Sequence, residues 1–229
     1  MHEFTILMPC LNEAKSLAFC IEQAKRGIDI LKLDAEILIA DNGSVDGSVE
    51  IAVHNGARVI KVEKKGYGEA IIGGIKAASG KYIIMGDADG SYDFGNLEAF
   101  VAELRNGYAL VMGNRFLGGI EKGAMPISHM LGVKILSTLA GRRFAARQIG
   151  DFHSGLRAFD REKALELNFR CPGMEFATEM VARFAMSGAR ITEVPTSLRR
   201  DKRGGKSHLR TVRDGMRHLC YIIFEKSGK

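Results

Sequence analysis

Two carboxylates separated by a single residue are the most chemically demanding feature of this sequence. Asp87 and Asp89 flank Ala88 and follow the apolar run at residues 82–85. At this spacing the two charges raise each other's pKa unless a cation or strong donors stabilise the ionised pair. A hard divalent ion, Mg²⁺ or Mn²⁺, meets that need because it takes oxygen ligands and also binds substrate phosphates. Asp-x-Asp is also ordinary turn chemistry, so its place at the end of a buried strand is what favours a ligand site.

Two further segments carry polar side chains directly after predicted strands. Residues 9–13, Pro-Cys-Leu-Asn-Glu, follow the first strand, where main-chain groups can contact a base and Glu13 can reach a ribose. Alternatively, this segment is a helix entry with Asn12 as its cap. Residues 41–47 follow the second strand. The Asp41 carboxylate can accept a hydrogen bond from a nucleobase, but the same residues are also typical of a plain turn.

The glycine-containing segments narrow the class of ligand. Residues 65–68, Lys-Gly-Tyr-Gly, stand before a predicted helix, whose N-terminus favours anions. No Gly-x-Gly-x-x-Gly follows the first strand, which argues against a nicotinamide-dependent oxidoreductase. No Gly-x-Ser-x-Gly elbow is present, so a hydrolase of that type lacks its nucleophile.

These motifs need a scaffold that brings strand ends together. The first half of the chain alternates short apolar runs with helical patterns, which indicates βαβ units. Pro9 is expected to stop the first strand, and Asp46 to cap the second helix. The order predicts an α/β fold with a Rossmann-like, mostly parallel sheet, whose strand ends share one edge. Strands are predicted at 4–8, 36–40, 57–61, 81–85 and 109–112, and helices at 13–32, 46–54, 65–79 and 96–105.

The second half of the chain is less regular. Residues 118–123 are predicted to form a mobile loop. Helices are expected near 128–140, 175–187 and 209–224, and strands near 156–159 and 190–194. The last helix is predicted to carry one apolar face made of Val212, Met216, Leu219, Ile222 and Ile223.

Composition is that of a globular protein. Of the 229 residues, 46% are hydrophobic and 26% are charged, which is ordinary for a single domain. The four cysteines show no CxxC spacing and are interpreted as buried small hydrophobic residues in a reducing compartment. No signal peptide is predicted, and no apolar run approaches the ~20 residues of a membrane-spanning helix.

The basic charge is concentrated at the C-terminal end. Residues 190–229 carry eleven Lys and Arg against four acidic residues, whereas the whole chain has a net charge of +6. With an amphipathic last helix, this end suits a bilayer surface with anionic lipid, where each cation contributes about 1 kcal/mol. A solvated basic patch over a core-packed helix is the alternative. Nucleic acid is not the expected partner, because few aromatic side chains lie among these cations.

Taken in order, the motifs resemble those of glycosyltransferase family 2, in its dolichol-phosphate mannosyltransferase-like (polyprenyl-phosphate glycosyltransferase) branch. The resemblance covers nearly the whole chain. The motifs are Pro-x-x-Asn-Glu at 9–13, Asp-x-Gly-Ser-x-Asp-Gly at 41–47, Lys-Gly-x-Gly at 65–68, Asp-Ala-Asp at 87–89, Gly-Asn-Arg at 113–115, Asp-Phe-His-Ser-Gly at 151–155, Glu-Val-Pro at 193–195 and Gly-Lys-Ser-His-Leu at 205–209.

The resemblance implies a GT-A fold and inverting transfer of a sugar from a nucleotide-sugar donor to a polyprenyl phosphate acceptor. It implies a nucleotide-sugar-binding half at 1–115, an acceptor-side half at 116–198, and a basic loop with an amphipathic helix at 199–229. The expected enzyme is a metal-dependent hexosyltransferase, cytoplasmic and peripheral at the cytoplasmic face of the membrane.

The resemblance also implies roles for single residues. Asp89, Asp87 and Ser91 form the expected site for Mg²⁺ or Mn²⁺, with Asp89 as the main ligand and Asp87 near the ribose and metal. Arg115 matches an arginine near the donor or acceptor phosphates. The implied nucleotide-sugar site comprises Pro9, Leu11, Asn12, Glu13, Asp41, Gly68, Asp87, Ala88 and Asp89. The implied phosphate-gripping segment contains Lys202, Arg203, Lys206 and Ser207.

The chemistry that follows is stabilisation of charge. A metal and cations stabilise the leaving nucleoside diphosphate as the sugar becomes oxocarbenium-like. An acceptor phosphate is already anionic at neutral pH, so it needs positioning more than deprotonation. Asp151 is the candidate base or acceptor-orienting group, with a turn cap as its alternative. Three residues depart from the family pattern. Asn42 stands where the family often has a second Asp, and Ser91 where it often has a stronger metal ligand. Lys202 stands where the family has an arginine, although Arg203 lies beside it.

Three other activities fit parts of the same pattern. A family 2 enzyme acting on a sugar hydroxyl in polysaccharide or lipid-glycan synthesis would need Asp151 as a true base. A catalytically silent nucleotide-sugar or membrane-binding module would bind nucleotide without transfer. A nucleotidyltransferase would release pyrophosphate.

Overall fold

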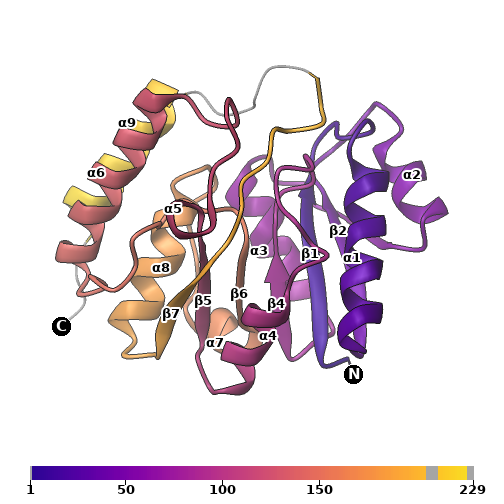
Figure 1. The fold of residues 1–229 in the computed structure, drawn as a ribbon, viewed down its shortest axis with the longest axis horizontal. Helices are drawn as coiled ribbons and strands as arrows, with labels where there is room; N and C mark the ends of the chain where they lie inside the picture. Colours follow the sequence, from indigo (N-terminus) through magenta and orange to yellow (C-terminus); the bar gives the residue numbers. More distant parts are fainter. Residues whose placement is uncertain (1, 205–210, 226–229) are drawn as a thin grey trace.

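The structure, a computed structural model, describes residues 2–204 and 211–225. Its centre is a seven-stranded sheet in the order β3-β2-β1-β4-β6-β5-β7 (Figure 1). The strands are β1 (Phe4–Cys10), β2 (Ala35–Asp41), β3 (Arg58–Lys61), β4 (Tyr82–Met85), β5 (Leu110–Asn114), β6 (Arg157–Asp160) and β7 (Ile191–Pro195). The helices are α1 (Leu17–Leu31), α2 (Ser48–His54), α3 (Tyr67–Ala77), α4 (Glu98–Arg105), α5 (Arg115–Gly118), α6 (Ile127–Arg143), α7 (Arg161–Glu166), α8 (Phe176–Met186) and α9 (Thr211–Phe224).

The predicted α/β fold with a mostly parallel sheet is confirmed, with one addition to the topology. β6 lies between β4 and β5 and is antiparallel to both, while the other pairs are parallel. Because β6 runs the opposite way, its beginning lies at the edge where β4 and β5 end. The segment that enters β6, residues 151–156, is therefore brought to the same edge as the segments that leave the parallel strands.

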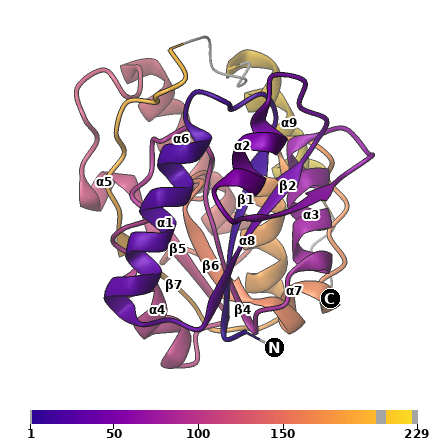
Figure 2. The ribbon, with the colours of Figure 1, turned by 90° about the vertical axis from the view of Figure 1, so that its right-hand side faces the viewer.

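Helices cover both faces of the sheet (Figure 2). Alternate residues of β1 divide between the two cores: Phe4, Ile6 and Met8 face α1, α2 and α4, whereas Leu7 faces α3 and α8. This alternation is what a strand buried on both faces requires. At the β7 end of the sheet, α6 and α9 lie side by side (Figure 1).

Two local expectations at the start of the chain are wrong in detail. β1 continues through Pro9 to Cys10, because its pairing with β4 ends at Leu7 and Met85 and the ring of Pro9 interrupts no ladder there. The second helix is capped by Gly47, which has a left-handed conformation with φ 89°. Asp46 accepts a hydrogen bond from the N–H of the residue after that glycine instead.

Three expectations in the second half also change. The loop at 118–123 is tied down, because the Glu121 N–H donates to the Leu198 carbonyl (2.8 Å) and the Leu198 N–H donates to the Gly119 carbonyl (2.9 Å). The predicted apolar face of the last helix is divided, with Ile222 in the core and Val212, Met216 and Ile223 exposed. Not all cysteines are buried: Cys220 is exposed. Among the described residues, no helix is long and apolar enough to cross a bilayer.

Candidate active site

The segments after β1 and β2 are joined by hydrogen bonds at the carboxyl edge of the sheet. The Asn12 N–H donates to Ser44 Oγ (2.9 Å), and the Val45 N–H donates to Asn12 Oδ1 (2.9 Å). The Glu13 N–H donates to Ser48 Oγ (2.9 Å). Asn12 therefore links two loops, in a left-handed conformation with φ 57°, and does not cap α1, which begins at Leu17.

Asp41 lies at the end of β2, opposite Cys10 of β1. Its carboxylate accepts hydrogen bonds from the N–H groups of Gly43 (3.0 Å) and Ser44 (3.1 Å), and it is buried. This is turn chemistry, but it also fixes a carboxylate at the strand end. Among the neighbouring predicted residues, Pro9 is buried within β1, whereas Leu11 is exposed.

Asn42 is committed to a structural task. Its Nδ2 donates to the carbonyl oxygens of Val62 (3.1 Å) and Lys64 (2.7 Å), and its Oδ1 accepts from the Gly66 N–H (2.8 Å). An aspartate, which has no donor when ionised, would face two carbonyl oxygens. The departure from the family pattern therefore has a local cause: the amide holds the 62–66 segment against the end of β2.

Asp87 and Asp89 lie in the loop after β4, as predicted. Asp87 Oδ1 accepts from the Tyr67 hydroxyl (3.0 Å). Limited access of water raises the pKa of the Asp87 carboxyl, and the charge of Asp89 raises it further. Asp89 is buried, and its Oδ1 accepts from the Ser91 N–H (2.9 Å). Ser91 thus supports Asp89 through its backbone.

Ala88 and Gly68 also act through their backbones. The Ala88 carbonyl accepts from Ser16 Oγ (2.8 Å), which connects the loop to the start of α1. The Gly68 N–H donates to the Pro172 carbonyl (2.9 Å), and a Cβ at this position would collide with the Cys171 carbonyl. Glycine is needed at 68 for close packing against the segment before α8.

Arg203 bridges the carboxylates of the first and fourth strand ends. Its Nη2 lies 2.9 Å from Asp89 Oδ2 and its Nη1 lies 3.1 Å from Glu13 Oε1. Burial raises the pKa of Glu13 to about 7, although the charge of Arg203 opposes the shift. The Lys202 N–H donates to the Asp89 carbonyl (2.8 Å), while its Nζ lies over the Phe19 ring, 4.2 Å from the centroid. Of the two adjacent cations, Arg203 reaches the carboxylates. Lys206 and Ser207 lie outside the described residues.

Arg115 and Asp151 form a buried ion pair on the other side of the same edge. Arg115 Nε donates to Asp151 Oδ2 (2.7 Å) and Nη2 donates to Oδ1 (2.7 Å); the backbone N–H groups of Arg115 (3.2 Å) and His153 (3.3 Å) also donate to this carboxylate. Arg115 is 6% exposed and Asp151 is 0% exposed. Within the described residues, Arg115 Nη1 has no hydrogen-bond partner, so its N–H groups can bind a ligand.

Three residues of the site, Tyr67, Tyr92 and Arg157, were not predicted from the sequence motifs. Tyr67 is the variable residue of Lys-Gly-x-Gly, and its partner Asp87 is 20 residues away. The Tyr92 hydroxyl accepts from the Gly155 N–H (2.7 Å), which ties the loop after β4 to the loop before β6. Arg157, 1% exposed, donates to the Ser154 carbonyl (3.1 Å) in the latter loop and to the Ala177 carbonyl (3.2 Å), and so joins that loop to α8. Of these residues, Tyr92 stands three residues after Asp89, and this nearness to the Asp-x-Asp motif is the signal that could have found it.

Comparison with known proteins now places the chain. The sequence profile described as Glycosyl transferase family 2 matches residues 5–167. The chain belongs to glycosyl transferase family 2.

Several curated relatives of this family 2 protein come from the archaeon Haloferax volcanii. The chain is 36% identical over 225 residues to the low-salt glycan biosynthesis hexosyltransferase Agl6, covering 98% of this chain and 54% of Agl6. It therefore spans about half the length of that relative. A dolichyl-phosphate hexose transferase from the same organism is 30% identical over 207 residues, with 90% of this chain and 86% of that protein covered.

Solved structures support the fold assignment. Glucosyl-3-phosphoglycerate synthase from Mycobacterium tuberculosis, in complex with Mn²⁺, UDP and phosphoglyceric acid, matches with a TM-score of 0.72 and 22% identity, covering 96% of this chain and 76% of that one. The same enzyme has also been solved with Mg²⁺ and UDP. The fold of this family 2 protein is therefore GT-A, as the resemblance implied.

The carboxylates of this family 2 protein fit a hard divalent ion. Asp89 offers an oxygen that already holds a cationic group, the Arg203 guanidinium, at 2.9 Å. Within the described residues no group of three or more His, Cys, Asp or Glu side chains forms a complete metal cage. The two carboxylates of Asp87 and Asp89 would be enough for Mg²⁺, which usually keeps waters and takes one or two carboxylates together with substrate phosphates.

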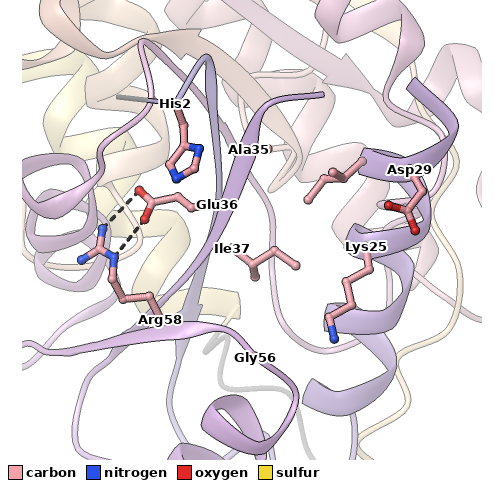
Figure 3. A pocket seen from close by; sticks show the side chains of 9 residues that line it. His2, Lys25, Asp29, Ala35, Glu36, Ile37, Gly56 and Arg58 are labelled. Carbon is pink, nitrogen blue, oxygen red and sulfur yellow. Dashed lines mark hydrogen bonds and ion pairs between the residues drawn. The ribbon is translucent and has the colours of Figure 1, made fainter. Parts of the chain in front are cut away.

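A separate hollow lies away from these residues. Its volume is about 360 Å³, and Figure 3 shows that it lies between α1 and the N-terminal ends of β2 and β3. The Arg58 guanidinium and the Glu36 carboxylate on its wall are paired with each other (2.9 Å). Glu36 is further satisfied by the Ser79 N–H (2.7 Å) and Thr5 Oγ1 (2.8 Å). The Arg58–Glu36 pair is thus bound to its own neighbours, and the hollow lies apart from the sequence motifs at the carboxyl edge of the sheet.

Proposed function

We propose that this protein transfers a hexose from a nucleotide sugar to a polyprenyl phosphate, with inversion, at a membrane surface. The observation that carries the proposal is the Arg115–Asp151 pair. A hydroxyl acceptor needs a base, but both oxygens of Asp151 are taken by a buried guanidinium at 2.7 Å. A phosphate acceptor needs a positioned cation, and Arg115 Nη1 supplies one. The pair therefore favours an anionic acceptor over a sugar hydroxyl.

The donor belongs at the other side of the edge, between the segments after β1, β2 and β4. Asp41 and Glu13 are the groups for the nucleoside, and Asp87 lies between them and the loop before β6. Asp89 is the residue that would hold Mg²⁺ or Mn²⁺, and the ion would stabilise charge on the leaving diphosphate. The UDP and Mn²⁺ bound by glucosyl-3-phosphoglycerate synthase support this placement.

Arg203 is suited to the donor diphosphate. Its guanidinium already lies at Asp89 and Glu13, and a planar guanidinium binds phosphate oxygens through two parallel hydrogen bonds. We propose that it turns from these carboxylates to the diphosphate when donor and metal bind. A relative of which 86% is covered, a dolichyl-phosphate hexose transferase, supports by its name a lipid phosphate as the acceptor.

The membrane surface is the proposed location of the acceptor. On α6, exposed apolar side chains recur every four residues: Ile127, Leu131, Ile135 and Leu139. The neighbouring α9 exposes Val212, Met216, Ile223 and Phe224. Two adjacent helices that each present apolar side chains, with cations nearby, suit insertion into the interface of an anionic bilayer. The α9 helix also packs onto the domain through Tyr221 and Ile222, as the alternative interpretation of its sequence expects, and its exposed side is the part that we propose to meet the membrane.

The test of the reaction compares acceptors that differ in one group. The purified chain is incubated with UDP- and GDP-hexoses and Mn²⁺, and with a polyprenyl phosphate, the matching polyprenol, or an oligosaccharide. We expect a glycolipid with the phosphate alone and its loss in Asp89→Asn. Transfer to the polyprenol or the oligosaccharide but not to the phosphate would refute the acceptor class. Donor binding without any transfer would identify a silent module, and released pyrophosphate a nucleotidyltransferase.

The test of the membrane proposal uses vesicles with and without anionic lipid. Ile127 and Leu131 are 84% and 60% exposed, so replacing both with serine should weaken binding by about 2 kcal/mol, roughly thirtyfold. Val53→Ser on α2 is the matched control, since Val53 is 61% exposed at the other end of the sheet. Equal binding by the double variant and the control variant would refute docking through α6.

A further inference from the structure

We infer that Glu193 is a positioning residue for the Arg115–Asp151 pair, an inference that rests on the proposed function for its catalytic meaning. Glu193 belongs to the Glu-Val-Pro motif on β7, to which the sequence pattern attached no role. Among the described residues, no hydrogen bond or ion pair joins it to Arg115 or Asp151. It contacts the residues that immediately precede each of them.

The two oxygens of Glu193 bind two separate segments. Oε1 accepts from Asn114 Nδ2 (2.7 Å), and Oε2 accepts from the Gly150 N–H (2.7 Å). Asn114 directly precedes Arg115, and Gly150 directly precedes Asp151. A single carboxylate therefore fixes the separation of the two chain segments that carry the ion pair.

Asn114 passes this constraint into α5. Its Oδ1 accepts from the N–H groups of Phe116 (2.9 Å) and Leu117 (3.1 Å), which caps the helix whose first residue is Arg115. The amide of Asn114 is thus held at both ends, by the helix on one side and by Glu193 on the other. This fixes the direction in which the Arg115 side chain leaves the backbone.

The absence of a side chain at Gly150 is independent evidence that this backbone segment packs closely against Asn114 and Glu193. A Cβ there would lie 3.1 Å from Asn114 Nδ2 and 3.5 Å from Glu193 Oε1. A side chain at this position would press on the Asn114 amide and lie in contact with the Glu193 carboxylate. Glycine at 150 therefore lets the segment before β6 approach Asn114 and Glu193 closely. We call these three residues, Asn114, Gly150 and Glu193, the clamp.

The chemistry of the clamp explains why a carboxylate is present. Both partners are uncharged donors, and within the described residues Glu193 forms no ion pair. Only a carboxylate offers two acceptors at the required separation; a glutamine would direct an N–H at one of the donors. Supporting residues of this kind hold the reacting groups in place before the ligand binds. Less entropy is then lost when the ligand and these groups are brought into the reactive orientation.

A reciprocal exchange of donor and acceptor tests the inference. Glu193→Gln leaves one donor without an acceptor, and Asn114→Asp places two carboxylates against each other. In the double variant the new carboxylate at 114 still caps α5 and accepts from the new amide at 193, whose oxygen still accepts from the Gly150 N–H. Every hydrogen bond of the clamp is restored, and the net charge equals that of the wild type.

We expect each single variant to lower turnover about 10- to 100-fold, as misplacement of reacting groups does, and the double variant to return to within about threefold of wild type. Binding of UDP with Mn²⁺ should not change in any of them, because the donor residues lie elsewhere. Glu162→Gln, an exposed glutamate on α7, is the control. Wild-type turnover in Glu193→Gln, or a double variant no better than the weaker single one, would overturn the inference.

A second readout does not depend on the reaction. Hydrogen exchange of peptides covering residues 114–118 and 149–153 should accelerate in both single variants and return to the wild-type rate in the double variant. Unchanged exchange in the single variants would also overturn the inference. If wild-type protein transfers no sugar to a polyprenyl phosphate, the proposed function fails, while exchange still decides whether Glu193 holds the two segments.

Discussion

Removing one member of the Arg115–Asp151 pair should cost far more stability than removing both. Asp151→Asn leaves the guanidinium buried without a counter-charge, and Arg115→Met leaves a carboxylate that is 0% exposed without its cation. Breaking a buried ion pair in this way costs about 3–5 kcal/mol. For a chain of this size about 1 kcal/mol shifts the melting temperature by 2–4 °C, so each single variant should melt roughly 6–20 °C lower.

The double variant Arg115→Met with Asp151→Asn removes both charges and keeps an acceptor for the backbone N–H groups of residues 115 and 153. Its loss of stability should be smaller than that of either single variant, because no unpaired charge remains buried. Thermal and urea unfolding of the four proteins give the coupling free energy. The exposed pair Lys163–Glu166, 3.0 Å apart, is the matched control and should show about 0.5 kcal/mol or less. Additive losses at 115 and 151 would refute the reasoning.

Turnover of the same variants separates the two acceptor classes. If Asp151 deprotonates a hydroxyl, Asp151→Asn abolishes transfer, whereas a phosphate acceptor leaves part of it. Arg115→Met should be the more severe change for a phosphate acceptor, because it removes the Nη1 group that we propose to bind the phosphate. Rates are compared well below the lowest melting temperature, so that unfolding does not contribute.

Three further outcomes are expected. UDP at 100 times its dissociation constant, with Mn²⁺, should stabilise the protein by about 2.7 kcal/mol. Asp89→Asn should remove the metal-dependent part of this thermal shift. If no nucleotide gives a metal-dependent shift, the proposed donor site is excluded. Asn42→Asp should cost at least about 2 kcal/mol in urea unfolding, since its donors to two carbonyl oxygens are lost; wild-type stability would contradict this account. Burial lowers the pKa of His153 and brings that of His218 to about 4, so the unfolded chain takes up protons near pH 6.5 before the folded one does. Their contribution to stability should be complete above pH 6.5 and decline as pH falls toward 4, by up to about 1.4 kcal/mol per unit for each histidine, and His218→Gln should flatten this slope in urea unfolding.

The sequence predicted the strands that carry the donor-side motifs well, because each consists of an apolar run followed by polar residues at one edge. It did not predict that β6 enters between β4 and β5, since a run of four residues, Arg157–Asp160, carries no sign of its direction. Ion pairs between residues far apart in the sequence could not be predicted either. Arg115 and Asp151 are 36 residues apart, and Arg203 and Asp89 are 114 apart, so motif spacing could not show that they meet.

Local chemistry was ambiguous for a related reason. Asp41 was open to ligand and turn interpretations, and Asn12 to ligand and helix-cap interpretations. The structure shows that the Asp41 carboxylate accepts from backbone N–H groups of its own turn, whereas Asn12 Oδ1 accepts from the Val45 N–H in another loop. The departure at Asn42 was visible in the sequence, but its cause lies in the carbonyl oxygens of the 62–66 segment, which only the fold brings there.

The antiparallel direction of β6 has a consequence for how this family can diversify. The chain leaves the sheet after β5 and returns in the adjacent strand, and the Gly113 N–H donates to the Leu156 carbonyl (2.9 Å) where the two ends meet. Residues 115–156, which include Arg115, α6 and Asp151, are thus topologically the tip of one long hairpin. Doubling a loop costs only about 0.6 kcal/mol of closure entropy, so this segment can lengthen, shorten or be exchanged while the parallel strands stay as they are. Under the proposed function, the choice of acceptor could then evolve independently of the choice of donor.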